Sequence, residues 1–523
     1  MTSGFLNSCR RFADRPALEV QGRRLTYRQL REKAASLAAT LQQAPSPDSE
    51  LTAVFAYRSE TAFTGVLAVL LSGHGYVPLN VTFPPERTRL MLQRSACRRL
   101  IVDGESERQL PLILEGSLEP LTVILPEREE VASLAASFPQ HRFLGAADLQ
   151  PAGLLTPVPV SVNSPAYVLF TSGSTGIPKG VMVSQQNVLS FVEVMVERYA
   201  VTECDRFSQM FDMTFDLSAF DMFVAWERGA CLCCPTKKES IMPQKYIRDS
   251  QITVWFSVPS TGIFMKTMGM LKPDCYPGLR LSLFCGEGLP SSLVSAWSEA
   301  APNSLIENLY GPTELTIACT LYRWDRQHSH AECENGLVPI GYPYPAMSVL
   351  VVNDKLEEVE PGETGELLMS GPQRSLGYWR DPEKTAAAFV VPPGKSELYY
   401  RTGDRVRRPL GDRPLIYLGR MDTQIKVLGH RVELAEIESV LREEAGIDTA
   451  IALGWPLTES GANGVVGFVK SNGLSSQEII TRAGRRLPDY MVPKQIHLME
   501  SFPLNSNGKV DRKELTKYLE MQL

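Results

Sequence analysis

The sequence lacks any run of about 18 uninterrupted apolar residues, the length that a helix needs to cross a membrane. Its start, MTSGFLNSCRRFADRP, also lacks the sustained apolar core of a secretory signal peptide. We therefore expect no membrane partner and a cytoplasmic location.

An excess of positive charge is missing as well. The 53 Lys and Arg residues are outnumbered by 59 Asp and Glu residues, which gives a formal net charge of −6. A general binder of nucleic acids or of anionic membranes needs the opposite balance. We expect small molecules or proteins as partners, and no nucleic acid.

The ten cysteines do not form the dense framework of a small secreted scaffold. They are scattered, and several lie in apolar stretches, so we expect reduced thiols. Cys231 and Cys233 have no second pair at a zinc-like spacing, which favours buried strand residues over a structural zinc site.

What the sequence does contain is a repeated alternation of strand and helix patterns. Residues 15–43 predict two short strands that turn at Gln21 and Gly22, followed by a helix, and residues 51–80 predict strand, helix, strand. This alternation is typical of an α/β fold with largely parallel sheets. From about residue 345 short strands and turns predict a β-rich subdomain, and the last hundred residues predict a small α+β domain.

The stretch VLFTSGSTGIPKG (168–180) has the composition of an anion-binding loop. Gly173, Gly176 and Gly180 leave backbone N–H groups accessible, and Lys179 adds a positive charge. Further donors are the hydroxyls of Thr171, Ser172, Ser174 and Thr175. The spacing differs from that of the usual P-loop, and a strand pattern follows the lysine, so we expect a hairpin loop between two strands. Taken alone, a flexible turn would explain the stretch equally well.

Six further segments occur together with this loop. They are LTYRQL (25–30), NLYGPTE (308–314), YRTGD (400–404), YLGRMDTQIKVLGHRVELAEIE (417–438), LPDYMVP (487–493) and NSNGKVDRKEL (505–515). In order and spacing they resemble the adenylate-forming superfamily, which contains nonribosomal peptide synthetase adenylation domains, acyl-CoA synthetases and luciferases. The resemblance covers nearly the whole chain.

The resemblance implies an enzyme that uses ATP and Mg²⁺. The family joins a carboxylate to the α-phosphate of ATP, releases pyrophosphate, and then passes the acyl group to a thiol. Such chemistry needs positioning and preorganised charge more than a protein nucleophile. The implied phosphate-binding residues are Thr171, Ser172, Gly173, Ser174, Thr175, Gly176 and Lys179, and the implied nucleotide-binding residues are Asn308, Tyr310, Asp404, Tyr417 and Arg420. Thr313 would bind the α-phosphate, and Glu314 would be the Mg²⁺ ligand.

The family's domain arrangement implies a large core at residues 1–421, with the β-rich subdomain at about 345–421, and a small mobile domain at 422–523. Asp422 corresponds to the hinge. Lys509 would enter the active site for adenylate formation, and Lys426 lies on the face presented for thioester formation. A rotation of the small domain would exchange the two lysines.

Asp216 in MTFDLSAFDMF aligns with the family residue that pairs with the α-ammonium group of an amino acid. A simple fatty or aryl acid would leave this carboxylate unpaired, at a cost in free energy. The remaining pocket residues implied by the motifs are Leu217, Phe220, Ser257, Leu283, Cys285, Leu309, Ile317 and Ala318. This lining predicts a small apolar amino acid, and we favour L-proline, with alanine or D-alanine as the alternative.

The chain ends soon after Lys509, which predicts a free-standing ligase whose acceptor is the phosphopantetheine thiol of a separate carrier protein. A basic patch near the hinge, with His430, Arg431 and the neighbours of Arg420, is the predicted docking surface. Two other readings stay open. One is an acyl- or aryl-CoA synthetase, and the other is a nucleotide-binding regulator without turnover.

Overall fold

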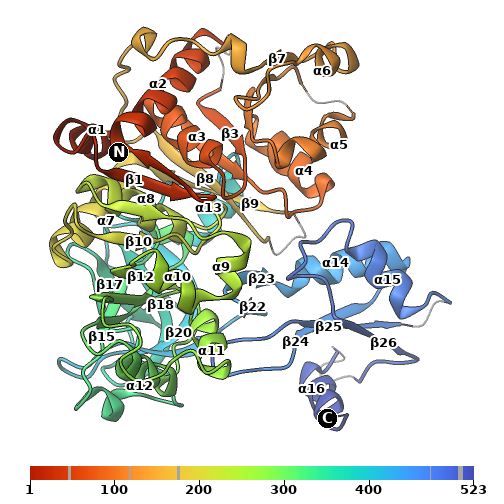
Figure 1. Ribbon diagram of the computed structural model, residues 1–523. Helices are drawn as coiled ribbons and strands as arrows, with labels where there is room; N and C mark the ends of the chain where they lie inside the picture. Colours follow the sequence, from red (N-terminus) through yellow and green to blue (C-terminus); the bar gives the residue numbers. More distant parts are fainter. Residues whose placement is uncertain (45–48, 117–118, 174–176, 471–472, 504–509, 523) are drawn as a thin grey trace.

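The fold is described from a computed structural model that covers residues 1–44, 49–116, 119–173, 177–470, 473–503 and 510–522. Figure 1 shows two large sheets with their helices in the red, orange, yellow and green parts of the chain, and a smaller blue unit at the carboxyl end. Among the described helices, none is long and apolar enough to span a bilayer.

Seven strands form the first large sheet, in the order β7-β6-β5-β3-β4-β8-β9. They are β3 (Leu51–Phe55), β4 (Gly75–Leu79), β5 (Arg99–Val102), β6 (Thr122–Ile124), β7 (Arg142–Leu144), β8 (Pro165–Thr171) and β9 (Lys179–Ser184). Neighbouring strands are parallel except for the last pair, since β8 and β9 form an antiparallel hairpin. The predicted strand–loop–strand arrangement around the glycine-rich loop is therefore confirmed.

The second large sheet has the order β16-β15-β14-β13-β12-β10-β11-β1-β2. Its strands are β1 (Pro16–Val20), β2 (Arg23–Thr26), β10 (Arg206–Ser208), β11 (Cys231–Cys233), β12 (Val254–Ser257), β13 (Leu281–Phe284), β14 (Leu305–Tyr310), β15 (Thr320–Arg323) and β16 (Tyr342–Pro343). The central strands from β1 through β14 are parallel. All ten cysteines are free thiols, and Cys231 and Cys233 are buried in β11, as the sequence predicts.

One apolar core joins the two sheets. It contains residues of both sheets and of the helices α2 (Tyr27–Gln43), α3 (Glu60–Leu71), α7 (Gln185–Arg198) and α8 (Leu217–Glu227). Local sequence explains how α2 begins, because Gln21 and Gly22 turn the chain with positive φ angles of 51° and 74°. Thr26 and Gln29 then close a reciprocal capping box at the start of the helix. The observed layers confirm the predicted α/β class.

A five-stranded sheet follows, built from β17 (Ser348–Val352), β18 (Thr364–Ser370), β19 (Phe389–Val390), β20 (Tyr399–Arg407) and β21 (Ile416–Arg420). The carboxy-terminal unit contains the hairpin β22 (Gln424–Val427) and β23 (His430–Glu433) and the sheet of β24 (Ala450–Gly454), β25 (Val465–Lys470) and β26 (Gln495–Met499). Its helices are α14 (Leu434–Ala445), α15 (Ser476–Ala483) and α16 (Arg512–Glu520). The exact domain boundary at residue 421 and the hinge at Asp422 stay predictions.

Candidate functional site

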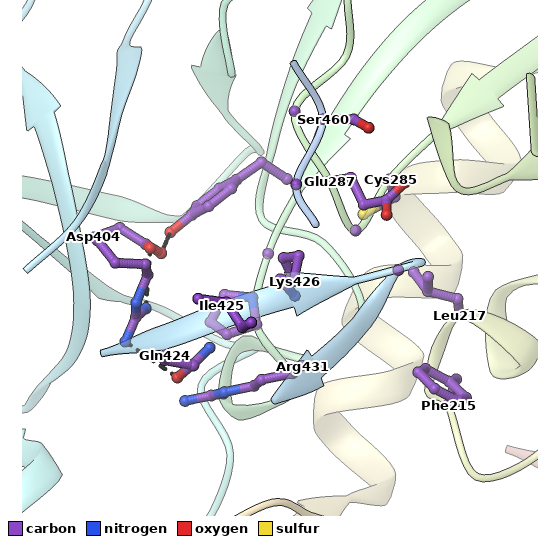
Figure 2. A pocket seen from close by; sticks show the side chains of 18 of the residues that line it. Phe215, Leu217, Cys285, Glu287, Asp404, Gln424, Ile425, Lys426, Arg431 and Ser460 are labelled. Carbon is purple, nitrogen blue, oxygen red and sulfur yellow. Dashed lines mark hydrogen bonds and ion pairs between the residues drawn. The ribbon is translucent and has the colours of Figure 1, made fainter. Parts of the chain in front are cut away.

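A cavity of about 520 Å³ lies between the large sheets and the hairpin β22–β23. The strands β8, β13 and β14 end at its wall, as is usual for ligand sites of parallel α/β sheets. Figure 2 shows Lys426 and Arg431 of the hairpin on one side of the cavity and Phe215 and Leu217 on another. Of the predicted site residues, the wall contains Thr171, Ser172, Asp216, Leu217, Cys285, Asn308, Leu309, Tyr310, Thr313, Asp404, Tyr417, Arg420 and Lys426.

Asp216 forms one end of the cavity, immediately before α8. The residue is 7% exposed, and its carboxylate accepts a hydrogen bond of 3.0 Å from the backbone N–H of Ile317. Burial raises the pKa of Asp216 to about 6, although the bonds from Ile317 and from the Thr313 hydroxyl oppose the rise. A buried carboxylate in this state is suited to bind a cationic ligand group.

The turn that supplies this N–H group is strained. Thr316 and Ile317 are β-branched residues, yet their φ angles are 58° and 74°, in the left-handed region. Gln373, which is 1% exposed, holds the turn because its side-chain amide donates to the carbonyls of Leu315, Thr316 and Ala318 at 3.3, 3.3 and 2.6 Å. The Thr316 hydroxyl donates in return to the Gln373 carbonyl at 2.6 Å. Sequence analysis missed Gln373, since these contacts span more than 50 positions in the chain.

Some predicted pocket residues lie behind the cavity wall instead of on it. They are Phe220, Ser257, Leu283, Ile317 and Ala318, all of which are buried. The Phe220 ring packs against Phe256 with ring centroids 4.8 Å apart, and Phe256 contacts Phe211 at the same separation. The prediction that Phe220 lines the pocket is corrected accordingly, because its ring belongs to this aromatic core.

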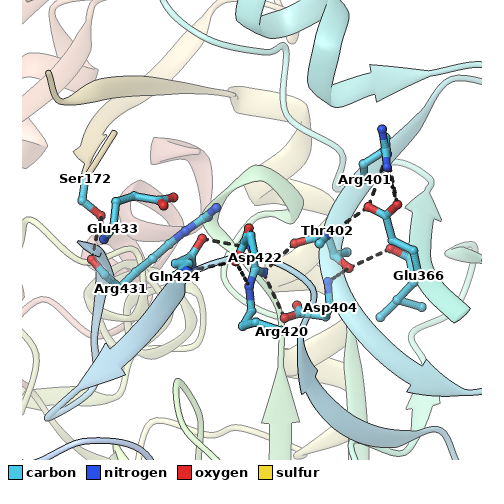
Figure 3. Close-up of polar contacts among 12 residues, drawn as sticks. Ser172, Glu366, Arg401, Thr402, Asp404, Arg420, Asp422, Gln424, Arg431 and Glu433 are labelled. Carbon is cyan, nitrogen blue, oxygen red and sulfur yellow. Dashed lines mark hydrogen bonds and ion pairs between the residues drawn. The ribbon is translucent and has the colours of Figure 1, made fainter. Parts of the chain in front are cut away.

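Tyr310, Asp404 and Arg420 form the other end of the cavity. The Tyr310 hydroxyl donates to Asp404, and Arg420 Nη1 lies 3.0 Å from the other Asp404 oxygen. Figure 3 shows how Arg420 also contacts Asp422 and Gln424, which follow it in the chain. This ion pair and hydrogen bond fix the direction of the Asp404 carboxylate, which lines the cavity together with the ring of Tyr310.

Two uncharged side-chain oxygens at the site are buried and have no hydrogen-bond partner among the described residues. They are the Thr171 hydroxyl and the Asn308 side-chain carbonyl oxygen. Both residues line the cavity. Buried polar groups in folded proteins are nearly always paired, so these two atoms indicate a place where a polar ligand binds.

Lys179 and Glu314 meet beside the cavity. Lys179 Nζ is 3.2 Å from Glu314 Oε1 and 3.1 Å from the Tyr378 hydroxyl, and that hydroxyl donates to Glu314 at 2.8 Å. Arg431 Nη1 contacts the second oxygen, Oε2, at 2.8 Å. Burial alone would raise the pKa of Glu314, but Arg431 and then Lys179 lower it far below its usual range.

Glu314 as described does not fit Mg²⁺. Both of its oxygens are engaged, two positive side chains face it, and the described residues contain no group of three or more His, Cys, Asp or Glu that could hold a metal. Mg²⁺ in such sites is held by carboxylates together with substrate phosphates and water. The arrangement described here therefore offers Mg²⁺ no ligand at Glu314, and we derive no step through Mg²⁺.

The hairpin β22–β23 brings Lys426 and Arg431 into the site together, because they are cross-strand partners. Its turn is Leu428–Gly429, and both residues have positive φ angles, of 49° and 84°. The ring of His430 stacks on Tyr490 at 3.7 Å and meets the edge of Phe215 at 4.7 Å. Burial and then Lys426 lower the pKa of His430 to about 4.

The predicted docking surface around His430 and Arg431 is wrong in this arrangement. The Arg431 side chain is only 14% exposed and lines the cavity, so it does not form a basic patch on the surface. The sequence did contain the information that places the Arg431 side chain in the cavity. A two-residue hairpin turn at Leu428–Gly429 pairs residue 426 with residue 431, so Arg431 had to face the same way as Lys426.

Two ionic residues were missed by the sequence analysis, Arg87 and Glu436. Arg87 lies on α4 (Pro85–Ser95) and contacts Glu436 of α14 at 2.5 Å, with both side chains buried. The other Glu436 oxygen accepts the backbone N–H of Gly173 at 3.1 Å. Ser174, Thr175, Gly176 and Lys509, which were predicted as site residues, lie outside the described residues.

Two family models match this chain. Residues 5–379 match the AMP-binding enzyme family, and residues 436–509 match the AMP-binding enzyme C-terminal domain. Novobiocin biosynthesis protein H of Streptomyces niveus is 32% identical over 95% of this chain and 79% of its own length. Tyrocidine synthase 1 of Brevibacillus parabrevis is 30% identical over 96% of this chain, which spans only 44% of that relative.

Solved structures of adenylation domains also resemble this chain. The Vibrio cholerae adenylation domain AlmE, in complex with glycyl-adenosine-5'-phosphate, has a TM-score of 0.88 and 31% identity, with 99% of this chain and 97% of that chain covered. NpsA-ThdA from Klebsiella oxytoca, an artificially fused adenylation-PCP di-domain, has a TM-score of 0.77 and 25% identity, with 95% and 93% covered. The chain therefore belongs to the AMP-binding enzymes of the adenylate-forming superfamily, as an adenylation domain of the nonribosomal peptide synthetase type.

Proposed function

We propose that this chain activates a small amino acid with ATP as an aminoacyl-AMP and then transfers the aminoacyl group to the phosphopantetheine thiol of a carrier protein. The observation that carries the proposal is one cavity with a buried carboxylate, Asp216, at one end and the Tyr310–Asp404–Arg420 group at the other. These charged groups in one cavity suit the ammonium group and the adenosine of a single adenylate.

In the first half-reaction a carboxylate oxygen of the amino acid attacks the α-phosphorus of ATP. The bond from that phosphorus to the bridging oxygen breaks, and pyrophosphate leaves. Asp216 holds the ammonium group, Asp404 accepts from the ribose hydroxyls, and Lys179 neutralises phosphate charge. Lys509 is the predicted bridge between the carboxylate and the phosphate. Every one of these contributions is positioning or electrostatic stabilisation, so no protein nucleophile is required.

In the second half-reaction the thiol sulfur attacks the carbonyl carbon of the adenylate, AMP leaves, and the thiol proton is released. Lys426 lines the cavity on the docked hairpin, where burial and then Arg431 lower its pKa. The adenylation-PCP di-domain relative supports a carrier protein as the acceptor. That this carrier is a separate protein stays a prediction.

The substrate is a small amino acid. L-proline is the prediction from the motifs, and alanine or D-alanine is its alternative. Glycine is a second candidate, which the AlmE structure with glycyl-adenosine-5'-phosphate supports. Apolar contacts discriminate one methylene by only about 1 to 3 kcal/mol, so the assay has to decide.

Amino-acid-dependent ATP–pyrophosphate exchange tests the proposal directly. We expect exchange with proline, glycine or alanine and none with fatty or aryl acids of similar size. Exchange with fatty or aryl acids alone would favour the CoA synthetase reading. No exchange with any acid would favour a nucleotide-binding regulator and overturn the proposed function.

A further inference from the structure

Thiol transfer in the proposed function releases one proton for each thioester formed. The carboxylates among the described residues of the cavity wall are Asp216, Glu287, Asp404 and Glu459. A carboxylate beside the reacting atoms can accept such a proton in the transition state and so speed the step. Which of the four is available decides where the proton goes.

Three of these carboxylates have another role or environment. Asp216 pairs with the substrate ammonium group in the proposed function, and Asp404 forms an ion pair with Arg420 at 3.0 Å. Glu459 is exposed, so water surrounds its carboxylate. Glu287 is half-buried and forms no ion pair with any described residue. It is therefore the carboxylate of the wall that is left to accept a proton.

Glu287 stands between the exposed rim of the cavity and its interior. Two positions before it in the chain is Cys285, which is 1% exposed. On its other side a Cβ at Gly288 would lie 3.3 Å from the carbonyl oxygen of Glu459, where the carboxy-terminal unit reaches the surface. Figure 2 shows Cys285, Glu287 and Lys426 in the same part of the cavity. A thiol that enters from the exposed rim reaches Glu287 before it reaches the interior.

Two backbone N–H groups hold the Glu287 carboxylate. Oε2 accepts the N–H of Ser260 at 2.7 Å, at the start of α11 (Pro259–Thr267), and the N–H of Gly429 in the hairpin turn adds a second hydrogen bond. The charged group that faces Glu287 from β22 is Lys426. Burial raises the pKa of Glu287 above its usual value, although the two N–H groups and then Lys426 oppose the rise. A raised pKa makes this carboxylate a stronger base than an exposed one.

We propose that Glu287 accepts the proton of the acceptor thiol while the sulfur attacks the carbonyl carbon of the aminoacyl-adenylate. The inference deepens the proposed function and rests on it. The S–H bond breaks and the proton moves to the carboxylate, while the S–C bond forms. The bond from the carbonyl carbon to the phosphate oxygen breaks, and AMP leaves with that electron pair. The carboxylic acid then returns its proton to water.

Glu287 also supports the start of α11, and the test has to separate this structural role from proton transfer. A helix cap needs only an acceptor oxygen, which glutamine also has. Glu287→Gln therefore keeps an acceptor for the Ser260 N–H and loses the basic carboxylate. Glu459→Gln is the matched control, since it removes a carboxylate of the same wall that water already surrounds.

The experiment follows a single turnover of aminoacyl-adenylate, formed in advance on the full chain, with pantetheine as the acceptor thiol. We expect Glu287→Gln to slow this transfer by about 100-fold or more, the range of general base catalysis. Trifluoroethanethiol is far more acidic and is largely ionised at mildly alkaline pH, so it needs no base. Its transfer rate should be nearly the same in Glu287→Gln and in the parent. Glu459→Gln should match the parent with both thiols.

The pH profile of the parent chain gives a test that needs no variant to fold. With Glu287 as the base, transfer to pantetheine should rise with pH only until this carboxylate is ionised, and should then stay constant well below the pKa of the thiol. Without a base the rate would follow the thiolate concentration and rise by about tenfold per pH unit up to the pKa of the thiol. That second profile in the parent would overturn the inference.

The remaining outcomes separate the inference from the proposed function. Equal slowing with both thiols in Glu287→Gln would leave Glu287 a purely structural role and overturn the inference. Unchanged transfer to pantetheine would assign the proton to Lys426, to AMP or to water, and would overturn it as well. In both cases the adenylate still forms, so the proposed function stands. A parent chain that forms no aminoacyl-adenylate from any amino acid overturns the proposed function, and the inference with it.

Discussion

Replacing Asp216 with Asn tests the amino-acid end of the cavity most directly. Asp216 is 7% exposed, so the pairing of its carboxylate with a substrate ammonium group would take place away from water. Removing one partner of such a buried charge pair costs about 2 to 5 kcal/mol. We therefore expect kcat/KM for the amino acid to fall by about 30- to 4,000-fold in ATP–pyrophosphate exchange, with ATP saturating.

The pH dependence of kcat/KM tests the role of Asp216 independently. Burial raises the pKa of Asp216 to about 6, and only the ionised form pairs with the ammonium group. For the parent chain kcat/KM should be constant above this pKa and should fall by about tenfold per pH unit below it. In the Asn variant this acidic limb should disappear, because the amide does not titrate.

Asp212→Asn is the matched control. Asp212 lies on the same loop and is half-buried, but it pairs with Asn80 at 2.7 Å and is not part of the cavity wall. The acidic limb should persist in this variant. The parent chain should prefer the amino acid strongly over an acid of similar size that lacks the amino group. In Asp216→Asn this preference should disappear. Parental kcat/KM together with an unchanged acidic limb in Asp216→Asn would refute the role of Asp216.

Three further substitutions address the other parts of the site. Asp404→Asn should raise the KM for ATP by about tenfold or more and leave the KM for the amino acid unchanged, and a uniform effect on both would contradict its place at the ribose. Asp422→Pro should keep ATP–pyrophosphate exchange and lose transfer to the thiol, whereas equal loss of both activities would refute the hinge. Lys509→Ala should abolish adenylate formation in a single-turnover assay, and a parental rate there would refute the predicted role of this lysine.

The parts of the fold that depend on neighbouring residues were predictable from the sequence. The turn at Gln21–Gly22 needs two residues that tolerate positive φ, and the capping box of Thr26 and Gln29 lies within four positions. The hairpin around the glycine-rich loop followed from two apolar strand patterns and the residues between them. In each case the information lies within a few residues of the element it specifies.

The direction of individual side chains was harder to predict. Phe220 and Leu283 were expected to line the amino-acid pocket, but both are 0% exposed and belong to the core behind it. A motif gives the position of a residue on a helix or strand, and it does not give the tertiary packing that decides which side chains reach a cavity. Arg431 was likewise expected at the surface, and the pairing of β22 with β23 turns it inward.

The strained turn at Thr316 and Ile317 limits how the amino-acid preference of this chain can be redesigned. Ile317 lies directly behind the pocket, so replacing it with glycine looks like a simple way to create volume. Glycine would also adopt a φ of 74° without strain and could leave it equally easily, so the N–H that now points at Asp216 would lose its fixed direction. Variants that keep Ile317 and Gln373 and enlarge the pocket through Leu217 or Cys285 retain the support of that carboxylate.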